Sequence, residues 1–322
     1  MKFGVNDAAV RFTGRWEIGK IAATTTAPGS MIEIAFTGKA AMLYFDMVMN
    51  VHPYPHVWIS VDDGAKIEAP LSHVLRVEGT DEGNHIIRVI YKSAVEIQHR
   101  WYQPLIGKVC FCGFEADGAG VLPPDDKKII EFIGDSITEG VLIDAMHKFE
   151  QFEQNNRPNQ DDSTATYAYL TAMALGMKPV IMGYGSVGVT RAGCGSVPKV
   201  AEAYPYNYHG SPAKAHNPDV IVINHGANDK GKPVELYLTE YRNLLEIVRK
   251  INPDAKMVVL SAFCGVYPAE LGGMVKAFNE ETGDSVYFID STGWIPEEPL
   301  HPLRDGHQIV ANHLTAKLRE IL

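Results

Sequence analysis

The stretch IIEFIGDSITEG, from Ile129 to Gly140, marks a change of fold in this 322-residue chain. Its apolar start predicts a short buried strand that ends at Gly134. Ser136 follows in a glycine-flanked turn, ahead of a segment that can form a helix, so its hydroxyl can point into a cleft. Backbone N–H groups after it can then face any oxyanion that forms there. The other interpretation is an Asp-Ser cap at the start of a helix, and the tripeptide alone does not separate the two.

From Lys128 onward, short apolar runs alternate with amphipathic helical segments. Five nearly all-apolar runs, as a parallel sheet covered on both faces requires, lie near residues 129–133, 179–182, 220–223, 257–261 and 286–290. Apolar side chains also recur at helical spacing after residue 234 and near the C-terminus. We therefore predict an α/β domain over residues 128–322, with a flavodoxin-like parallel sheet of about five strands. Sheets of this kind bind ligands beyond the carboxyl ends of their strands.

Residues 1–122 have a different pattern, in which β-type runs alternate with turns and no helical period is present. Asp63 and Gly64 mark a tight hairpin between two such runs. Short strands at regular spacing predict an antiparallel β-sandwich of jelly-roll type. Residues 123–127, PPDDK, are typical of a stiff linker between this domain and the α/β domain.

Two further polar blocks follow predicted strands of the second domain. The first is GYGSVGVT, at 183–190, whose glycines let a ligand approach the main chain closely. A backbone N–H of this loop is a candidate oxyanion donor, although an ordinary turn explains the same residues. The second is NHGAND, at 224–229, in which a side-chain amide can donate to a tetrahedral intermediate. The alternative there is an Asx turn, and we expect Asp229 to cap the next helix.

A last block, EPLHPLRDGH at 298–307, precedes the C-terminal helical segment. Nucleophilic serine chemistry needs a base that accepts the hydroxyl proton and returns it to the leaving alcohol, and histidine does this near neutral pH. Two histidines compete for the role, His301 and His307. Glu298, three residues before His301, is a candidate to orient the imidazole.

Taken in order, Ser136, Gly188, Asn228 and His301 resemble the four consensus blocks of the SGNH (GDSL-type) hydrolases. The resemblance spans roughly residues 128–322 and implies an α/β esterase or lipase with a Ser-His-Asp triad or a Ser-His dyad. It implies that Ser136 is the nucleophile and that the Ser136 N–H, the Gly188 N–H and the Asn228 side chain form the oxyanion hole. No metal or organic cofactor is needed for this mechanism.

The sequence departs from the family pattern before His301, and its second block leaves two candidate oxyanion donors. His301 fits the Asp-x-x-His-Pro pattern better than His307 because Pro302 follows it, but Glu298 stands where most of the family has aspartate. The longer Glu298 can reach the ring, leave its orientation to a backbone carbonyl, or be a surface charge. In the second block Gly185 competes with Gly188 as the oxyanion donor, and the family-like Thr190 favours Gly188.

The composition excludes several classes of partner. A net charge of −10 without a basic cluster argues against nucleic acid and anionic membranes. The first residues lack the apolar segment of a signal peptide, and no stretch approaches the length of a membrane span, so we expect a cytoplasmic protein. The cysteines, Cys110, Cys112, Cys194 and Cys264, are then expected to be reduced and largely buried, with Cys110 and Cys112 on one side of a strand.

Two features have a local interpretation only. The polar stretch 148–163 is a candidate lid or subunit contact, and a surface loop explains it equally well. Four aromatic residues are candidate sugar-stacking residues, although plain packing explains them too: Tyr204, Tyr206, Tyr208 and Trp294. The sequence leaves a homo-oligomer open.

A sandwich followed by an SGNH domain is similar to the family-two carbohydrate esterases and to bacterial acetylxylan esterases. The resemblance implies removal of O-acetyl groups from acetylated oligosaccharides, and several members work without the triad aspartate. A lipase or thioesterase for longer acyl chains is the first alternative. A carbohydrate-binding protein with an inactive hydrolase domain is the second.

Overall fold

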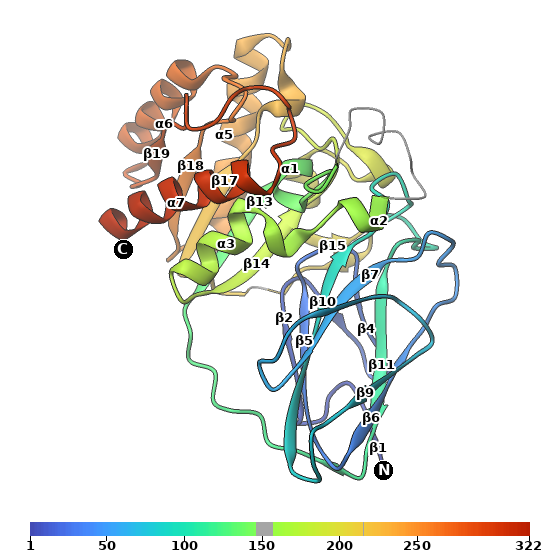
Figure 1. Cartoon of the computed structure of the whole chain (residues 1–322). Coiled ribbons are helices and arrows are strands. Elements are labelled where there is room, and N and C mark those ends of the chain that lie inside the picture. Colours follow the sequence, from blue (N-terminus) through green and yellow to red (C-terminus); the bar gives the residue numbers. More distant parts are fainter. Residues whose placement is uncertain (146–156, 215) are drawn as a thin grey trace.

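The computed structural model describes residues 1–145, 157–214 and 216–322, and these form two parts that pack against each other (Figure 1). The N-terminal part, coloured blue to cyan, consists of antiparallel strands, and the C-terminal part, green to red, is a parallel sheet with helices on both faces. The predicted fold class is therefore confirmed.

The N-terminal part contains two antiparallel six-stranded sheets. The strands are β1 (Lys2–Phe3), β2 (Val10–Thr13), β3 (Glu17–Ile18), β4 (Ala23–Thr25), β5 (Met31–Thr37), β6 (Ala40–Phe45), β7 (His56–Val61), β8 (Ile67–Pro70), β9 (Val74–Glu78), β10 (Asn84–Ser93), β11 (Val109–Glu115) and β12 (Gly118–Ala119). One sheet has the order β3-β4-β11-β6-β9 and the other β12-β5-β10-β7-β8, with β1 beside β11 and β2 beside β5. The jelly-roll connectivity stays our interpretation of this order.

Alternating side chains build the core between these sheets. In β6, Ala41, Leu43 and Phe45 are buried and pack in one apolar cluster with residues from the other sheet, as the period of two in a strand requires. Cys110 and Cys112 lie on one side of β11, as predicted, because their thiols are in hydrogen-bonding contact while Val109 and Phe111 point into the core. The expected burial is wrong for Cys112, which is exposed. The register of β11 against β6 shifts between Phe111 and Gly113, which marks a β-bulge there.

The C-terminal part is built on a five-stranded parallel sheet of order β14-β13-β17-β18-β19. Its strands are β13 (Ile129–Gly134), β14 (Lys178–Gly183), β17 (Val220–Asn224), β18 (Lys256–Leu260) and β19 (Tyr287–Ile289). The strand order is flavodoxin-like, as predicted. Ser136 lies just beyond β13, which neighbours the central strand β17 at the point where the strand order reverses and ligands usually bind.

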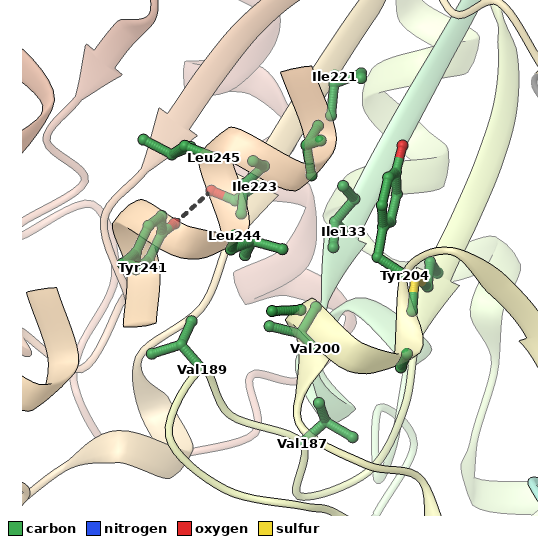
Figure 2. Close-up of a cluster of buried hydrophobic side chains, with 14 of the residues drawn as sticks. Ile133, Val187, Val189, Val200, Tyr204, Ile221, Ile223, Tyr241, Leu244 and Leu245 are labelled. Carbon is green, nitrogen blue, oxygen red and sulfur yellow. Dashed lines mark hydrogen bonds between the residues drawn. The ribbon is translucent and has the colours of Figure 1, made fainter. Parts of the chain in front are cut away.

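The described helices cover both faces of this sheet. They are α1 (Ser136–Glu139), α2 (Arg157–Gln160), α3 (Tyr167–Ala174), α4 (Val200–Ala203), α5 (Val234–Ile251), α6 (Pro268–Thr282) and α7 (Arg304–Ile321), with short 3-10 turns η3 (Ser163–Ala165), η4 (Cys194–Ser196) and η5 (Ala227–Asp229). Helices α3 and α7 pack on one face, whereas α4, α5 and α6 pack on the other. Figure 2 shows part of the apolar cluster on the face that α4, α5 and α6 cover. In this cluster the Tyr241 hydroxyl donates to the Ile223 carbonyl oxygen at 3.3 Å. A small two-stranded sheet, β15 (Tyr206–Tyr208) with β16 (Ser211–Pro212), completes this part.

The connection between the two parts follows the outer edge of the molecule (Figure 1). No helix or strand lies between Ala119 and Ile129, which is where the linker was predicted. Polar contacts hold this connection: Arg11 donates to the Pro123 carbonyl oxygen at 2.8 Å, and Lys178 pairs with Asp125 at 2.9 Å. The connection is thus attached to both parts, and the predicted domain boundaries at 122 and 128 stay predictions.

Part of the polar stretch 148–163 lies outside the described residues, namely 148–156. The rest is buried in the fold, since Arg157, Asp161 and Asp162 each expose 2% or less of their surface. A surface loop is therefore wrong for residues 157–163. No helix in the described part of the chain is long and apolar enough to cross a membrane. The cytoplasmic location and the oligomeric state stay predictions.

Candidate active site

The turn after β13 presents Ser136. Asp135 caps α1, and its Oδ1 accepts a hydrogen bond from the Ile137 N–H at 3.0 Å. Ser136 is the first residue of the helix, so its own N–H has no partner within the helix. Gly134 is required before the turn because a Cβ there would lie 2.0 Å from the Thr138 hydroxyl. Both sequence interpretations therefore hold together, since the helix cap and the presented serine belong to the same turn.

His301 lies against this serine. Its Nε2 is 2.9 Å from the Ser136 Oγ, although the two residues are 165 positions apart in the chain. Burial lowers the pKa of His301, so the ring is neutral near pH 7 and Nε2 can accept the hydroxyl proton. The structure thus brings the predicted nucleophile and the preferred base into direct hydrogen-bonding contact.

His307, the competing histidine, is part of the helix packing. It is buried in α7, and its Nδ1 accepts a hydrogen bond from the Tyr167 N–H at 3.0 Å. Its ring stacks on that of Tyr167, with 6.1 Å between the ring centroids. Burial lowers the pKa of His307 to about 3, so it stays neutral in the fold. Its contacts are with α3 and not with Ser136.

Glu298 is not brought to His301. Its side chain is exposed, and among the described residues no hydrogen bond or ion pair involves its carboxylate. Among the residues that the structure describes, no carboxylate accepts a hydrogen bond from Nδ1 of His301. The orientation of the ring by Glu298 that the spacing suggested is therefore wrong for this structure, because the loop that carries Glu298 turns its side chain to solvent.

Asn228 joins the three predicted loops. Its side-chain amide nitrogen lies 3.3 Å from Asp135 Oδ2 and donates to the Val187 carbonyl oxygen at 3.0 Å. It is thus held between the residue before Ser136 and the residue before Gly188. Both N–H groups of the amide are thus engaged, so an oxyanion on the serine would have to share or replace one of these bonds.

Asp229 fixes the neighbouring glycine loop and caps no helix. Helix α5 begins later, after Pro233, whereas the Asp229 carboxylate accepts from the Val189 N–H at 3.1 Å and the Thr190 N–H at 2.9 Å. The expected helix cap is therefore wrong. A Cβ on Gly188 would lie 2.7 Å from this carboxylate, which explains the glycine.

The Gly188 N–H is already engaged. It donates to the Arg191 carbonyl oxygen at 3.1 Å, so an oxyanion would have to share or replace that bond. Gly185, the other candidate, lies under the carboxylate of Glu96, whose Oε2 is 2.1 Å from the position of a Cβ on that glycine. Glu96 belongs to the segment after β10, so the N-terminal part reaches this loop.

The aromatic candidates are mostly packing residues. Tyr204 is buried, with its hydroxyl 2.9 Å from Glu131 Oε2, and Tyr208 is buried in the same apolar cluster. Trp294 stacks on His313 of α7, with ring centroids 5.1 Å apart. These three contacts belong to the core or to helix packing. Tyr206 is the exposed member of the set and lines a cavity of about 340 Å³.

Two buried arginines of the N-terminal part, to which no sequence pattern pointed, pair with the segment that bears Ser136. Arg15 pairs with Glu131 of β13 at 2.9 Å, and Arg100 pairs with Glu139 at the end of α1. All four side chains expose 3% or less of their surface. Burial raises the pKa of Glu139, which the nearby Arg100 charge opposes. Arg100 thus holds the end of the helix that begins at Ser136, and Arg15 holds the strand that leads to it.

Metal ligands are not grouped in the region that the structure describes, where no cluster of three or more histidine, cysteine or acidic side chains could hold an ion. The groups that the structure brings together at Ser136 are its hydroxyl, a neutral imidazole and nearby amide donors.

Two kinds of comparison with solved and curated proteins agree with this arrangement. The fold is similar to a family two carbohydrate esterase from Cellvibrio japonicus, with a TM-score of 0.81, 20% identity, and coverage of 100% of this chain and 97% of that one. It is also similar to the acetyl xylan esterase Est2A of the rumen bacterium Butyrivibrio proteoclasticus, with a TM-score of 0.78, 20% identity, and coverage of 99% and 98%.

Among curated proteins, an acetylxylan esterase / glucomannan deacetylase of Cellvibrio japonicus is 29% identical over 92% of this chain and 85% of its own length. The cellulase/esterase CelE of Acetivibrio thermocellus is 29% identical over 91% of this chain, which spans 37% of that longer protein. The family model of the GDSL-like lipases and acylhydrolases matches residues 132–309, more than half of the sequence and all of the blocks that supply Ser136, Asn228 and His301. The chain therefore belongs to the GDSL-like lipase/acylhydrolase family.

Proposed function

We propose that this protein is a serine esterase that removes O-acetyl groups from acetylated carbohydrates, such as xylo-oligosaccharides. The observation that carries the proposal is the 2.9 Å hydrogen bond between Ser136 Oγ and His301 Nε2, made by a neutral imidazole beside a capped serine turn. Family membership supports ester hydrolysis. The names of the relatives, acetylxylan esterase and glucomannan deacetylase, support an acetylated sugar as the substrate class.

In this proposal the reaction proceeds through an acyl-enzyme. His301 accepts the Ser136 proton at Nε2 while Oγ attacks the acetyl carbonyl carbon, and the carbonyl π electrons move to its oxygen. The Ser136 N–H donates to this oxyanion, and the Asn228 amide and the Gly188 N–H join it by sharing their bonds to Val187 and Arg191. The intermediate then collapses, the C–O bond to the sugar breaks, and the imidazolium returns its proton to the sugar oxygen.

Water completes the cycle by the same steps. His301 removes a proton from water, the hydroxide attacks the acetyl-serine, and the second intermediate expels Ser136 Oγ, which regains the proton. Acetate and the free enzyme result. Glu298 takes no part in this scheme, so the chemistry is that of a dyad with no carboxylate hydrogen-bonded to the imidazole.

The test is acetate release from acetylated xylo-oligosaccharides by the wild type, by Ser136→Ala and by the matched control Ser72→Ala, which lies on the exposed sandwich surface. We expect release by the wild type and the control and none by Ser136→Ala. Measurement of 4-nitrophenyl acetate and octanoate in parallel separates the substrate classes.

Three outcomes decide between the hypotheses. A strong preference for the acetate ester supports the deacetylase. Ser136-dependent cleavage of octanoate alone would keep the mechanism but make the protein a lipase or thioesterase. Binding of the sugar with no turnover of any ester would make it a carbohydrate-binding protein and overturn the proposal.

A further inference from the structure

Glu96 is an acidic side chain that the N-terminal part places on the glycine loop of the active site. It lies three residues after the end of β10, and its side chain is 16% exposed. Its Oε1 accepts a hydrogen bond from Arg157 Nη1 at 3.1 Å. Arg157 is itself buried and also pairs with Asp161 at 3.2 Å, which fixes the guanidinium and through it the carboxylate. Glu96 is therefore held in place by Arg157 and is not a mobile surface side chain.

The second carboxylate oxygen lies on the glycine loop of the active site. A Cβ on Gly185 would be 2.1 Å from Glu96 Oε2, so this position accommodates the carboxylate only because the residue is glycine. The same loop runs on to Val187, whose carbonyl oxygen accepts from Asn228. One wall of the site thus carries a charge that comes from the other domain.

His301 is the group on which this charge acts. Burial lowers its pKa most, the Glu96 charge raises it, and the Arg157 charge lowers it by less than Glu96 raises it. His307 also faces His301, from α7, but it is held neutral by burial. Glu298 is exposed and makes no contact with the ring in the described structure. The imidazolium that must form during catalysis therefore has one stabilising carboxylate among these groups, and that carboxylate is Glu96.

We propose that Glu96 is a positioning residue of the active site, an acid supplied by the N-terminal domain that stabilises the protonated His301 in place of the usual triad carboxylate. It acts through space across the site and accepts no proton. When Ser136 loses its proton to Nε2, the new positive charge forms near a carboxylate already fixed by Arg157 and Gly185. Because that carboxylate is ordered before the reaction, no reorganisation is needed at that moment. This inference rests on the esterase function proposed above.

The experiment compares Glu96→Gln, Glu96→Asp and Arg157→Gln with the wild type, using the pH dependence of 4-nitrophenyl acetate turnover. The His301 pKa is followed separately by NMR of ¹³C-labelled histidine, with the signal assigned by its loss in His301→Asn. Separate measurement is needed because burial raises the pKa of Asp135 to about 7, within the same pH range. Glu298→Gln is the matched control, an acid-to-amide change at an exposed acid.

The sign of each shift is fixed by the charge removed. Glu96→Gln removes a negative charge and should lower the His301 pKa by about half to one pH unit, with a roughly 10-fold loss of kcat/KM at the optimum. Glu96→Asp should keep the pKa nearer to that of the wild type. Arg157→Gln removes a positive charge and should raise the His301 pKa, the opposite direction. A purely structural ion pair predicts instead that both amide variants lose activity without opposite pKa shifts.

The outcomes separate this inference from the proposed function. If the wild type turns over esters and Ser136→Ala does not, but Glu96→Gln keeps the His301 pKa and the wild-type rate, the role of Glu96 is overturned alone. If the wild type hydrolyses no ester, the proposed function fails, and the NMR titration still tests the charge on His301. If Glu96→Gln has a lowered melting temperature, Arg157→Gln provides the second test. A raised His301 pKa in Arg157→Gln would support the inference whatever the stability of Glu96→Gln.

Discussion

The hydrolase domain and the sandwich domain contribute to one site by different means. From the hydrolase domain come Ser136, Asn228 and His301, each in a loop or turn, the first two directly after parallel strands. From the sandwich come Arg15, Glu96 and Arg100, charged residues outside its strands that pair with or lie on the loops of the hydrolase domain. In this protein, one domain supplies the reacting atoms and the other supplies charged groups around them.

The largest expected effect tests the hydrolase side of this comparison. His301→Gln should lower kcat/KM for 4-nitrophenyl acetate by about 10³-fold or more, because His301 is the base in hydrogen-bonding contact with Ser136 among the described residues. The double variant with Ser136→Ala should be no slower than either single variant, since the two residues act as a unit. Steady-state kinetics check both. Retention of more than about a tenth of the activity in His301→Gln would point to a different base.

The next effect tests the sandwich side. Arg100→Met leaves Glu139 as a buried carboxylate without its partner, so we expect a loss of about 3 to 5 kcal/mol in the free energy of unfolding. Urea denaturation measures this loss. The control is Arg242→Met, which breaks exposed pairs and should leave the free energy of unfolding nearly unchanged. Adding Glu139→Gln to Arg100→Met should recover part of the lost stability. Equal stability of Arg100→Met and the control would refute the role of the Arg100–Glu139 pair in holding the segment that bears Ser136.

A third prediction contrasts histidines of the two domains. His307 has a pKa lowered to about 3, so it stabilises the fold above pH 6.5 and loses that contribution as the pH falls toward 3. His85 of the sandwich has a pKa raised by its hydrogen bond to Asp62, so it stabilises below pH 6.5 and loses that contribution as the pH rises through its folded-state pKa.

Unfolding at several pH values checks these signs against variants that cannot titrate. From pH 6.5 to 5, the stability gap between the wild type and His307→Gln should narrow by about 2 kcal/mol, because only the wild type has to bury a group that now prefers a proton. For His85→Gln the gap should widen over the same interval. Parallel curves for His307→Gln and the wild type would mean that His307 is not buried in its neutral form.

The smallest effect concerns Glu298. Its carboxylate is exposed and makes no contact with His301 in the described structure, so Glu298→Gln should change kcat/KM by less than about twofold. Glu96→Gln, on the other domain, should exceed it clearly. A large loss in Glu298→Gln with none in Glu96→Gln would reverse the assignment of the acid and restore a triad within the hydrolase domain.

The sequence predicted the parts of this protein that depend on local pattern. The five parallel strands lie within two residues of the predicted runs, because strands buried on both faces are almost wholly apolar. Ser136, Asn228 and His301 were found because their blocks combine residue types and spacings that are rarely found together. Chain contacts over more than 100 residues have no such local signal, so Arg15 with Glu131 was missed.

The errors have equally local causes. Spacing placed Glu298 within reach of His301, but the path of the loop turned it outward. Tyr204 and Tyr208 were candidates for sugar stacking, but the apolar cluster behind β13 and β14 buries both rings (Figure 2 labels Tyr204). Cys112 was expected to be buried, but it lies on the outer face of the sandwich and is exposed.

The ion pairs that Arg15 and Arg100 make with the hydrolase domain also bear on how the gene of such a protein can recombine. A gene segment that encodes residues 128–322 alone carries Glu131 and Glu139 without Arg15 and Arg100, and so leaves two buried acids with no counter-charge. Recombination that separates the halves would therefore damage the catalytic turn even though every residue that reacts remains present. We therefore expect the two domains to be inherited together as one gene segment. We also expect substitutions to occur together at Arg15 and Glu131, and together at Arg100 and Glu139.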